Sequence, residues 1–502
     1  MAAKSRDKWQ FGDFQTPDSL TTKIANVLQS SVDFEPALIV EPSCGKGSFL
    51  LAVAKVFRNS RVIGRDINEA YVQICKDLTR DIGNPNISVE YGDFFQTDWE
   101  ALFLGESGQI LIIGNPPWVT SSELGMLNSN NLPLKDNFES KRGIHAITGY
   151  SNFDISEWMI LRYLDWIKNR DGRIAVLCKS SVARKIVRSL YKEKTFGAKA
   201  SIYSIDAQRY FGAAVEACLL VIEKQLSSIH CYVYESLESK RHQYVISEDD
   251  GILIRDLDSY LKVKHLKTDK AELVWRSGIK HDCSKVMEIT YSDGLYFNGN
   301  KEEVQLEDTH LYPLLKSSDI GNGRVASCRK RVIVTQTRVG QDTTHIRTSS
   351  PLTWSYLSSK AAIFSKRKSS IYRGKPLYSI FGVGDYTFSP WKIAISGLYK
   401  NLFFQLVGPI DGKPAVFDDT VSFLSFDSFD QALFVRDLLM TEESQLFYDS
   451  QIFWDEKRPI TTDILKRLSL LSLAVCLGRE VEYSRWFGRD IGRQPEQLEL
   501  IA

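Results

Sequence analysis

A rigid turn built from Asn115, two prolines and Trp118 stands directly after the apolar run at 110–114. Since proline makes up about one residue in twenty, an Asn-Pro-Pro-aromatic tetrapeptide is expected by chance at roughly one position in 10⁵. Two fixed φ angles make such a turn costly unless the positions of its polar groups matter. Asn115 offers a side-chain carbonyl and Pro116 a main-chain carbonyl, which together form two preorganised hydrogen-bond acceptors. The turn therefore predicts a catalytic site that holds an amino group. A plain proline-rich loop is the alternative.

A second group of residues surrounds two glycines, Gly45 and Gly47, between an apolar run and an amphipathic stretch. Glycines at these positions let main-chain amides approach a ligand at the start of a helix. The segment has neither the GxGxxG pattern nor the Lys-Ser/Thr of a Walker motif, and Glu41 stands in place of a phosphate cradle. A carboxylate here favours a ligand with a positive end, such as the amino group in the methionine part of S-adenosylmethionine. Ser43 belongs to the same candidate cofactor site, and Asn115 is a candidate cofactor contact as well as a catalytic residue.

Two acids follow at the ends of the next two predicted strands. Asp66, with Ile67 after it, comes about twenty residues after the glycine turn, where an acid can accept hydrogen bonds from both ribose hydroxyls. Asp93 can accept a hydrogen bond from an adenine amino group, and the ring of Phe94 can pack on that adenine. Each acid alone could instead cap a helix. The order and spacing of the four residues together favour cofactor binding.

These residues need a parallel sheet to bring them together, and the first half of the chain has the pattern of one. Up to about residue 225, short apolar runs alternate with amphipathic stretches, as strands and helices do in a parallel α/β sheet. Strands are predicted at 37–40, 61–64, 87–91, 110–114, 172–178, 201–206 and 218–223. Helices are predicted at 19–28, 48–57, 69–79, 153–168 and 181–190. From about 240 onward the pattern is less regular, with β-like pieces at 331–335 and 391–396 and helices near 428–449 and 461–476.

The second half carries a strongly basic segment. Residues 324–375 hold twelve Lys and Arg against one acid, Asp342, in a chain whose formal net charge is only +1. Aromatic residues lie among and after these cations, a mixture that suits phosphate contacts and stacking on bases or sugars. The alternative is a solvated basic face beside an aromatic core. The candidate nucleic-acid-binding residues are Arg329, Lys330, Arg331, Arg338, Lys366, Arg367, Lys368 and Arg373.

In the order of its motifs, the chain from residue 11 to about 225 resembles the gamma-group DNA adenine-N6 methyltransferases of type II restriction-modification systems. The segment Phe14-Gln15-Thr16-Pro17 resembles the motif that helps to close over the cofactor, and Thr16 is its candidate contact. The glycine turn resembles the family's glycine-rich motif. The two acid-bearing segments resemble the adenosine-holding motifs, and the Asn-Pro-Pro-Trp turn resembles the catalytic motif.

Later segments continue the resemblance. Residues 172–179 and 208–215 resemble the family's later motifs, the second of which places an aromatic residue, here Phe211, against the target base. Trp118 stands where Tyr or Phe is more usual. The polar connection at 119–150 is too long for a routine turn, and we expect it to order on DNA, with an ordinary mobile insertion as the alternative.

The resemblance implies a Rossmann-like S-adenosylmethionine-dependent methyltransferase domain of α/β class at 1–230 and a mixed α+β target-recognition domain at 231–502. The implied reaction transfers a methyl group from S-adenosylmethionine to N6 of an adenine flipped out of duplex DNA, which protects the DNA from a cognate restriction endonuclease. Asn115 and Pro116 would accept hydrogen bonds from the adenine amine. Trp118 and Phe211 would sandwich the flipped base.

Whole-chain composition excludes several classes of protein. The 502 residues are 43% hydrophobic and 25% charged, as in ordinary soluble globular proteins. The longest strongly apolar stretch, 468–477, is about half as long as a bilayer-spanning helix, and the first residues carry no signal-peptide core. The eight cysteines are scattered, without a CxxC pair for zinc or a disulfide framework. We therefore expect a cytoplasmic protein that binds no metal.

Other functions compete with this interpretation. An RNA adenine or protein-glutamine N-methyltransferase would need the same catalytic turn, but more than 250 residues follow the catalytic half here. A catalytically silent DNA-binding subunit would not need Asn115, Asp66 and the glycines. A fused restriction enzyme would need a nuclease domain, and the catalytic half begins near residue 11, while Glu238-Ser239-Lys240 lacks a preceding Pro-Asp. We expect any endonuclease to be a separate polypeptide, and a monomer to suffice.

Overall fold

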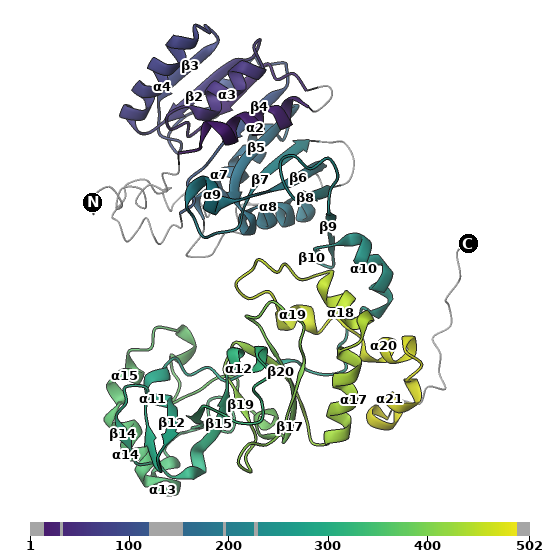
Figure 1. Ribbon diagram of the computed structural model, residues 1–502. Coiled ribbons are helices and arrows are strands. Elements are labelled where there is room, and N and C mark those ends of the chain that lie inside the picture. Colours follow the sequence, from purple (N-terminus) through teal and green to yellow (C-terminus); the bar gives the residue numbers. More distant parts are fainter. Residues whose placement is uncertain (1–14, 31–33, 120–153, 194–196, 225–228, 489–502) are drawn as a thin grey trace. The chain divides into compact units, whose positions relative to one another are not determined.

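The computed structural model describes residues 15–30, 34–119, 154–193, 197–224 and 229–488 (Figure 1). The chain divides into two compact units, Met1–Leu257 and Asp258–Ala502. Within the described ranges, no helix is long and apolar enough to cross a membrane.

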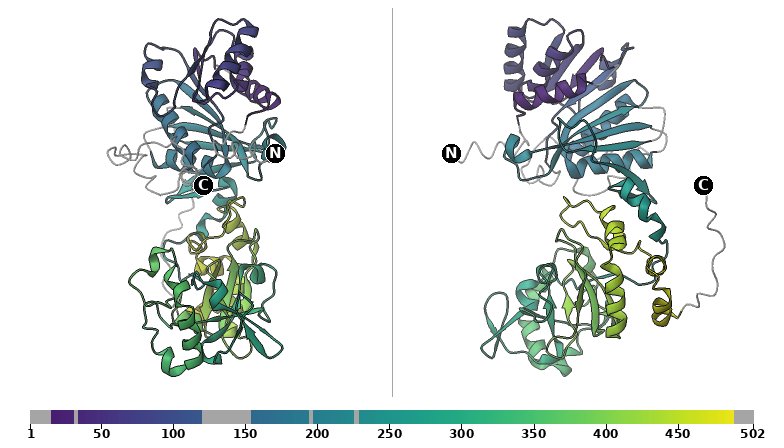
Figure 2. Two further views of the ribbon diagram at one scale, coloured as in Figure 1. Left: turned by 90° about the vertical axis from the view of Figure 1, so that its left-hand side faces the viewer. Right: turned by 45° about the vertical axis from the view of Figure 1, so that its right-hand side comes forward.

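The first unit is built on a ten-stranded sheet in the order β10-β9-β8-β6-β7-β5-β4-β1-β2-β3. Strands β3, β2, β1, β4 and β5 are mutually parallel, and β7 runs antiparallel between β5 and β6. The central strands β1 and β4 are buried along their whole length, because helices cover both faces of the sheet (Figure 2). The bounds are β1 Leu38–Glu41, β2 Arg61–Asp66, β3 Ile87–Tyr91, β4 Ile110–Gly114, β5 Gly172–Lys179, β6 Ala198–Ile205, β7 Ala217–Lys224, β8 His230–Tyr234, β9 Tyr244–Asp249 and β10 Ile252–Ile254.

The helices of this unit begin where local capping groups are available. The side chain of Asn68 accepts hydrogen bonds from the amides of Ala70 and Tyr71 at the start of α4, and Gly83 ends that helix in the left-handed conformation. The bounds are α2 Asp18–Gln29, α3 Ser48–Val56, α4 Glu69–Ile82, α5 Trp99–Phe103, α7 Ile155–Ile167, α8 Ser180–Lys192 and α9 Ala207–Phe211. All seven predicted strands and all five predicted helices of the first half are present, with shifts only at their ends. The predicted α/β class is confirmed.

The boundary between the units differs from the predicted one. The predicted boundary lies after residue 230, but β8 pairs in parallel with β6, and β9 pairs with β8, so the sheet continues beyond that point. The Tyr191 hydroxyl also donates to the main-chain oxygen of Ile246 at 2.8 Å, which ties α8 to β9. The structural division therefore falls after Leu257.

The second unit contains a four-stranded sheet, β11-β20-β17-β18, and a six-stranded sheet, β14-β13-β12-β16-β15-β19. Its strands are β11 Arg276–Ser277, β12 Glu288–Ser292, β13 Leu295–Phe297, β14 Glu303–Val304, β15 Leu311–Leu315, β16 Lys330–Ile333, β17 Trp391–Ser396, β18 Gln405–Val407, β19 Val416–Phe417 and β20 Val421–Phe426. Its helices are α10 Leu257–Val263, α11 Ser284–Met287, α12 Ser317–Gly321, α13 Ile346–Ser349, α14 Pro351–Ser359, α15 Ala361–Ser365, α16 Asp385–Phe388, α17 Phe429–Leu439, α18 Glu442–Asp449, α19 Thr462–Leu465, α20 Leu470–Cys476 and α21 Glu480–Phe487. Short 3₁₀ turns are η3 Lys264–Leu266, η4 Asp308–His310 and η5 Ser370–Tyr372. The two β-like pieces and the C-terminal helices predicted for this half are present, so the mixed α+β class is confirmed.

Candidate active site

The carboxyl ends of four parallel strands bring the predicted site residues to one edge of the sheet. Strand β1 ends at Glu41, which pairs with Gly64 of β2, and Val40 pairs with Ile112 of β4. Asp66 ends β2, and Asn115 follows the last residue of β4. Ligands of open α/β sheets bind outside the carboxyl ends of the strands, so this edge is the expected place for a site.

The N-terminal segment connects the glycine turn to the catalytic turn. The Asn115 Nδ2 atom donates to Thr16 Oγ1 at 3.3 Å, and Thr16 is buried. The Lys46 amide donates to Gln15 Oε1 at 3.3 Å. Thr16 therefore orients the Asn115 amide group, a role that its sequence pattern did not indicate, and Gln15 is a contact that the sequence analysis did not single out. Phe14 lies outside the described residues.

Glu41 is a carboxyl group buried at the centre of the site. Its side chain is only 3% exposed, and its Oε2 atom has no hydrogen-bond partner among the described residues. Burial raises the pKa of Glu41 well above its ordinary value, with the charge of Asp66 acting in the same direction. Burial removes the water that would stabilise the charged carboxylate. A cationic ligand would take the place of that water, so this carboxyl group favours a ligand with a positive charge.

The glycine turn has the backbone geometry that only glycine adopts easily. Gly47 has a φ of 88° directly before α3, and a Cβ atom there would lie 2.3 Å from Cys75 Sγ. Gly45 has a φ of 51° and lies against the Gln15 side chain. The turn therefore packs tightly against α4 and the N-terminal segment. Ser43, also a predicted contact, is half-buried in it.

The Asp66 carboxylate braces the glycine turn. It accepts hydrogen bonds from the amides of Gly45 and Asn68, both at 2.8 Å. Asn68 caps α4 itself, so Asp66 is not the helix cap that we weighed as the alternative. Each carboxylate oxygen can accept a further bond, which leaves a ribose contact possible in chemical terms. Ile67 beside it is 40% exposed and offers an apolar surface.

Asp93 and Phe94 are held in place by their surroundings. The Asp93 carboxylate accepts hydrogen bonds from the Phe95 amide at 2.8 Å and from Gln96 Nε2 at 2.9 Å. The Phe94 ring lies in an aromatic cluster, with centroids 5.6 Å from Trp99 and 5.8 Å from Trp158. This cluster fixes the ring while leaving it half-buried, so one part of it remains accessible.

Trp118 and Phe211 do not form the predicted sandwich. Their ring centroids lie 5.2 Å apart with planes crossing at 69°, an edge-to-face contact that has no room for a base between the rings. The indole is drawn into the core because its Nε1 donates to the Leu177 main-chain oxygen at 3.3 Å, and the side chain is only 6% exposed. Phe211, on α9, is half-buried and is the more accessible of the two rings.

Half of the predicted DNA-binding cations have partners inside the second unit, and DNA contact by these residues stays a prediction. Arg329 pairs with Asp319 at 2.6 Å, Lys330 with Glu288 at 2.7 Å, and Arg331 with Asp411 at 2.7 Å. Arg367 donates to the main-chain oxygens of His281, Leu377 and Ser379 and lies 3.6 Å from the Tyr372 ring centroid. Groups with such partners are not available to phosphates without breaking these contacts. Arg338, Lys366, Lys368 and Arg373 are exposed, and the described part of the chain offers their side chains no hydrogen-bond or ion-pair partner.

Comparison with known proteins decides the family. The family described as N-6 DNA Methylase matches residues 2–254. The chain belongs to the N-6 DNA methylase family. It is 42% identical over 472 residues to "Type II methyltransferase M.NspV" from Nostoc sp., and the match covers 93% of this chain and 98% of that protein. The predicted enzyme class, a DNA adenine methyltransferase related to restriction-modification enzymes, is confirmed. Placement in the gamma group stays a prediction.

Two further proteins are similar to this N-6 DNA methylase, one in sequence over part of the chain and one in fold over most of it. "Type II methyltransferase M.CvrRI" from Paramecium bursaria Chlorella virus XZ-6E is 36% identical over 109 residues, which cover 22% of this chain and 25% of that protein. The structure of the Type IIL restriction-modification enzyme MmeI in complex with DNA matches with a TM-score of 0.52 and 12% identity, covering 89% of this chain and 64% of that one. This second match shows similarity of fold over both units.

Proposed function

We propose that this N-6 DNA methylase transfers a methyl group from S-adenosylmethionine to N6 of an adenine within a specific duplex sequence, as the modification enzyme of a restriction-modification system. The observation that carries the proposal is the position of Asn115, which follows β4 at the carboxyl edge of the sheet with its amide held by Thr16. The description of the family, N-6 DNA Methylase, and the DNA complex of MmeI support the DNA substrate. An RNA or protein substrate is not favoured by them.

The residues at the edge of the sheet fit S-adenosylmethionine. Glu41, buried and lacking a partner for Oε2 among the described residues, suits the ammonium group of the methionine part. Asp66 and Ile67 suit the ribose and the adjoining apolar surface, and Asp93 and Phe94 suit the adenine. Ser43, Gly45 and Gly47 form the turn that lets main-chain amides approach the cofactor. When bound, this cofactor supplies a methyl group on a positively charged sulfur.

Asn115 and Pro116 prepare the nitrogen that receives the methyl group. The lone pair of the adenine amine is delocalised into the ring, so the nitrogen is a poor nucleophile. Hydrogen bonds from its two protons to the Asn115 side-chain oxygen and the Pro116 main-chain oxygen favour tetrahedral geometry and localise the lone pair. The rest of what the protein contributes is positioning, because the attacking adenine nitrogen must be aligned with the methyl group that it receives. No base with a shifted pKa is needed before transfer.

The target adenine must leave the duplex to reach this turn. Flipping a base costs a few kcal/mol, and stacking on one aromatic ring contributes roughly 1 to 3 kcal/mol. Trp118 and Phe211 touch edge to face. We therefore propose that the two rings form one aromatic surface that contacts the base, and that Phe211 is the exposed part of this surface. The loop at 119–150, nearly all of which lies outside the described residues, stays a candidate for ordering on DNA.

The second unit is proposed as the target-recognition domain, and its exposed cations as phosphate contacts. Changing Lys366 and Lys368 together to Ala is expected to weaken binding to all duplexes and to lower the log–log salt slope by roughly 0.9 for each phosphate that the variant no longer neutralises. Arg329→Ala is the matched control, because that guanidinium pairs with Asp319. Salt titrations of duplex binding, followed by fluorescence anisotropy, measure both slopes. An unchanged slope in the double variant would identify a solvated basic face.

Glu41→Gln is expected to weaken S-adenosylmethionine binding roughly 10- to 100-fold, because the variant cannot form a charge-assisted hydrogen bond. Since burial raises the pKa of Glu41, binding of a cation by the parent should tighten as the pH rises through that pKa, and the Gln variant should not show this dependence. Calorimetry at several pH values tests both effects. Glu35→Gln, an exposed position before the opposite end of β1, is the control. Equal affinities for the parent and Glu41→Gln at every pH would remove Glu41 from the cofactor site.

Sequencing with detection of modified bases tests the whole proposal. DNA from cells that express this chain alone should carry N6-methyladenine at one sequence motif, and DNA from cells expressing the Asn115→Ala variant should carry far less at that motif. Absence of methylation in both samples would contradict the proposed activity. A cytoplasmic location, action as a monomer and a separate cognate endonuclease belong to the same proposal, and restriction of unmethylated DNA by a neighbouring gene product tests the last of these.

A further inference from the structure

The second unit presents a tight turn whose tip is exposed. The turn directly follows the buried continuation of β16, and the Gln341 amide closes it by donating to the Arg338 main-chain oxygen at 3.2 Å. Gly340 has a φ of 83°, which allows the chain to reverse there. Val339 and Gly340 are therefore the central residues of the turn, and Arg338 is its first residue.

Buried and polar side chains hold this turn in one conformation. Gln336 is 1% exposed; its Nε2 atom donates to the Gln341 main-chain oxygen, and its Oε1 atom accepts from the Ile380 amide at 3.0 Å. Gln341 Oε1 accepts from the Thr337 amide at 2.7 Å and from the Thr337 hydroxyl at 2.9 Å. The main chain of the turn is thus ordered before any ligand arrives, which lowers the entropic cost of binding through it.

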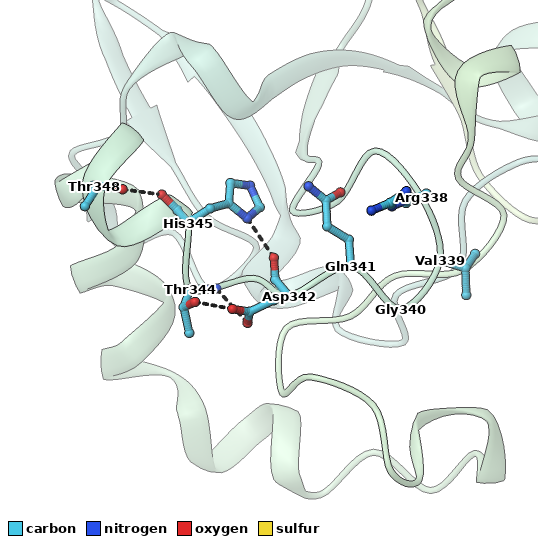
Figure 3. Close-up of a pocket in the computed structure, with 8 residues that line it drawn as sticks. All are labelled: Arg338, Val339, Gly340, Gln341, Asp342, Thr344, His345 and Thr348. Carbon is cyan, nitrogen blue, oxygen red and sulfur yellow. Dashed lines mark hydrogen bonds between the residues drawn. The ribbon is translucent and has the colours of Figure 1, made fainter.

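The turn carries one exposed cation and, next to it in the chain, one exposed apolar side chain. Among the described residues Arg338 has no ion-pair partner, and Val339 is 45% exposed. Figure 3 shows Val339 pointing away from the row formed by the Arg338, Gln341 and His345 side chains. These residues line an open cavity of about 680 Å³. Asp342 also lines it, but its carboxylate accepts from the Thr344 amide and hydroxyl.

A second loop brings more cations beside the turn. Lys375 Nζ lies 3.9 Å from the position that a Cβ atom on Gly340 would occupy. The chain leading to Lys375 carries the exposed Lys366, Lys368 and Arg373. Lys375 is therefore a second exposed cation beside the rigid turn, on a segment that carries further exposed cations. In complexes with DNA, cationic side chains around the interface bind phosphates, and a group in a fixed position within the interface can contact a base edge.

We propose that the turn at 337–341 enters a groove of the target DNA and that Arg338 reads a guanine there. A guanidinium held by a rigid turn can donate two hydrogen bonds to guanine O6 and N7, the commonest specific contact in the major groove. Val339, whose side chain points away from that of Arg338, adds exposed apolar surface to the turn, which suits thymine methyl groups and not phosphates. The inference rests on the proposed DNA substrate and names a residue that sets sequence specificity.

The test compares Arg338→Ala and Arg338→Lys with the parent on a library of duplexes in which each base of the methylated motif is varied. Arg338→Ala should reduce discrimination at one guanine roughly 5- to 150-fold while preferences at the other positions stay unchanged. Arg338→Lys should lose most of the same discrimination but keep the salt slope, because lysine retains the charge without the two-pronged donor. Lys368→Ala is the control and should weaken binding equally for all duplexes.

The outcomes separate the inference from the proposed function. If the parent methylates no duplex in the library, the proposed function is wrong, whereas a parent that methylates one motif establishes it independently of Arg338. An unchanged motif in both Arg338 variants would overturn the inference. A uniform loss across all sequences would also overturn it, since it would make Arg338 a phosphate contact. Thermal melting of each variant shows whether the second unit remains folded.

Discussion

Asn115→Ala is expected to lower methyl transfer to adenine by roughly 10²- to 10³-fold or more, while S-adenosylmethionine still binds. The variant removes one of two preorganised acceptors, and the loss of a single such group at an active site has effects of this size. Cofactor binding should survive because most of the contacts assigned to it lie elsewhere: Glu41 and Asp66 end other strands, and Asp93 follows β3. Single-turnover kinetics with an adenine-containing duplex measure the first effect, and calorimetry the second.

Thr16→Val provides the matched comparison. It removes the acceptor of the Asn115 Nδ2 hydrogen bond but leaves the Asn115 carbonyl in place, so activity should fall by less than in Asn115→Ala. Its effect should appear in the rate of transfer more than in cofactor affinity. Near-normal turnover in Asn115→Ala would end the catalytic assignment. Equal losses in cofactor binding and in turnover would instead indicate that the turn had collapsed.

The sequence was a good guide to the strand ends of the first unit for a physical reason. Parallel strands buried on both faces are short apolar runs, and their carboxyl ends meet at one edge of the sheet, so order along the chain predicts proximity. Glu41, Asp66 and Asn115 lie at that edge as expected. The domain boundary was missed because β8 pairs in parallel with β6, and the antiparallel β9 then pairs with β8, a continuation of the sheet that local patterns do not reveal.

Tertiary partners explain the other differences. Arg331 pairs with Asp411, eighty positions away along the chain, and Lys330 pairs with Glu288. Counting charges within 324–375 could not show that these cations have acidic partners outside the segment. The contact between Trp118 and Phe211 likewise depends on how β4, β5 and α9 pack. Residue type indicated that both rings belong to the site, but only packing determines the angle between them.

Lys392, in the core of the second unit, is another residue whose tertiary environment the local sequence does not reveal. It stands in β17, whose predicted bounds match the observed ones, yet its side chain is only 1% exposed. Its Nζ atom donates to the Ser389 main-chain oxygen at 2.6 Å, a neutral partner that does not balance a charge. Burial lowers the pKa of Lys392 to about 7. The neighbouring strands contribute Val407 and Ser425 at the paired positions.

Lys392→Met is therefore expected to stabilise the second unit, most strongly at low pH. The folded state releases the lysine proton above about pH 7, whereas the unfolded state keeps it up to its ordinary pKa near 10.5. Between these values the unfolded state binds more protons, so the parent's free energy of unfolding should rise with pH, by an amount on the order of 4 kcal/mol. Below pH 7 both states are charged and the burial penalty is fully present. Met fills a similar volume without a charge.

Hydrogen exchange of the β17 and β20 amides at pH 6, 7.5 and 9 measures this difference locally in the intact chain. After correction for intrinsic exchange rates, the gain in protection of Lys392→Met over the parent should be largest at pH 6 and should shrink as the pH rises, because deprotonation relieves the parent. Lys400→Met, at an exposed position of the same unit, should give no pH-dependent gain. A constant difference between Lys392→Met and the parent at all three pH values would mean that Lys392 is not titrating in this range. Loss of protection at pH 6 would mean that its charge has a compensating partner in solution.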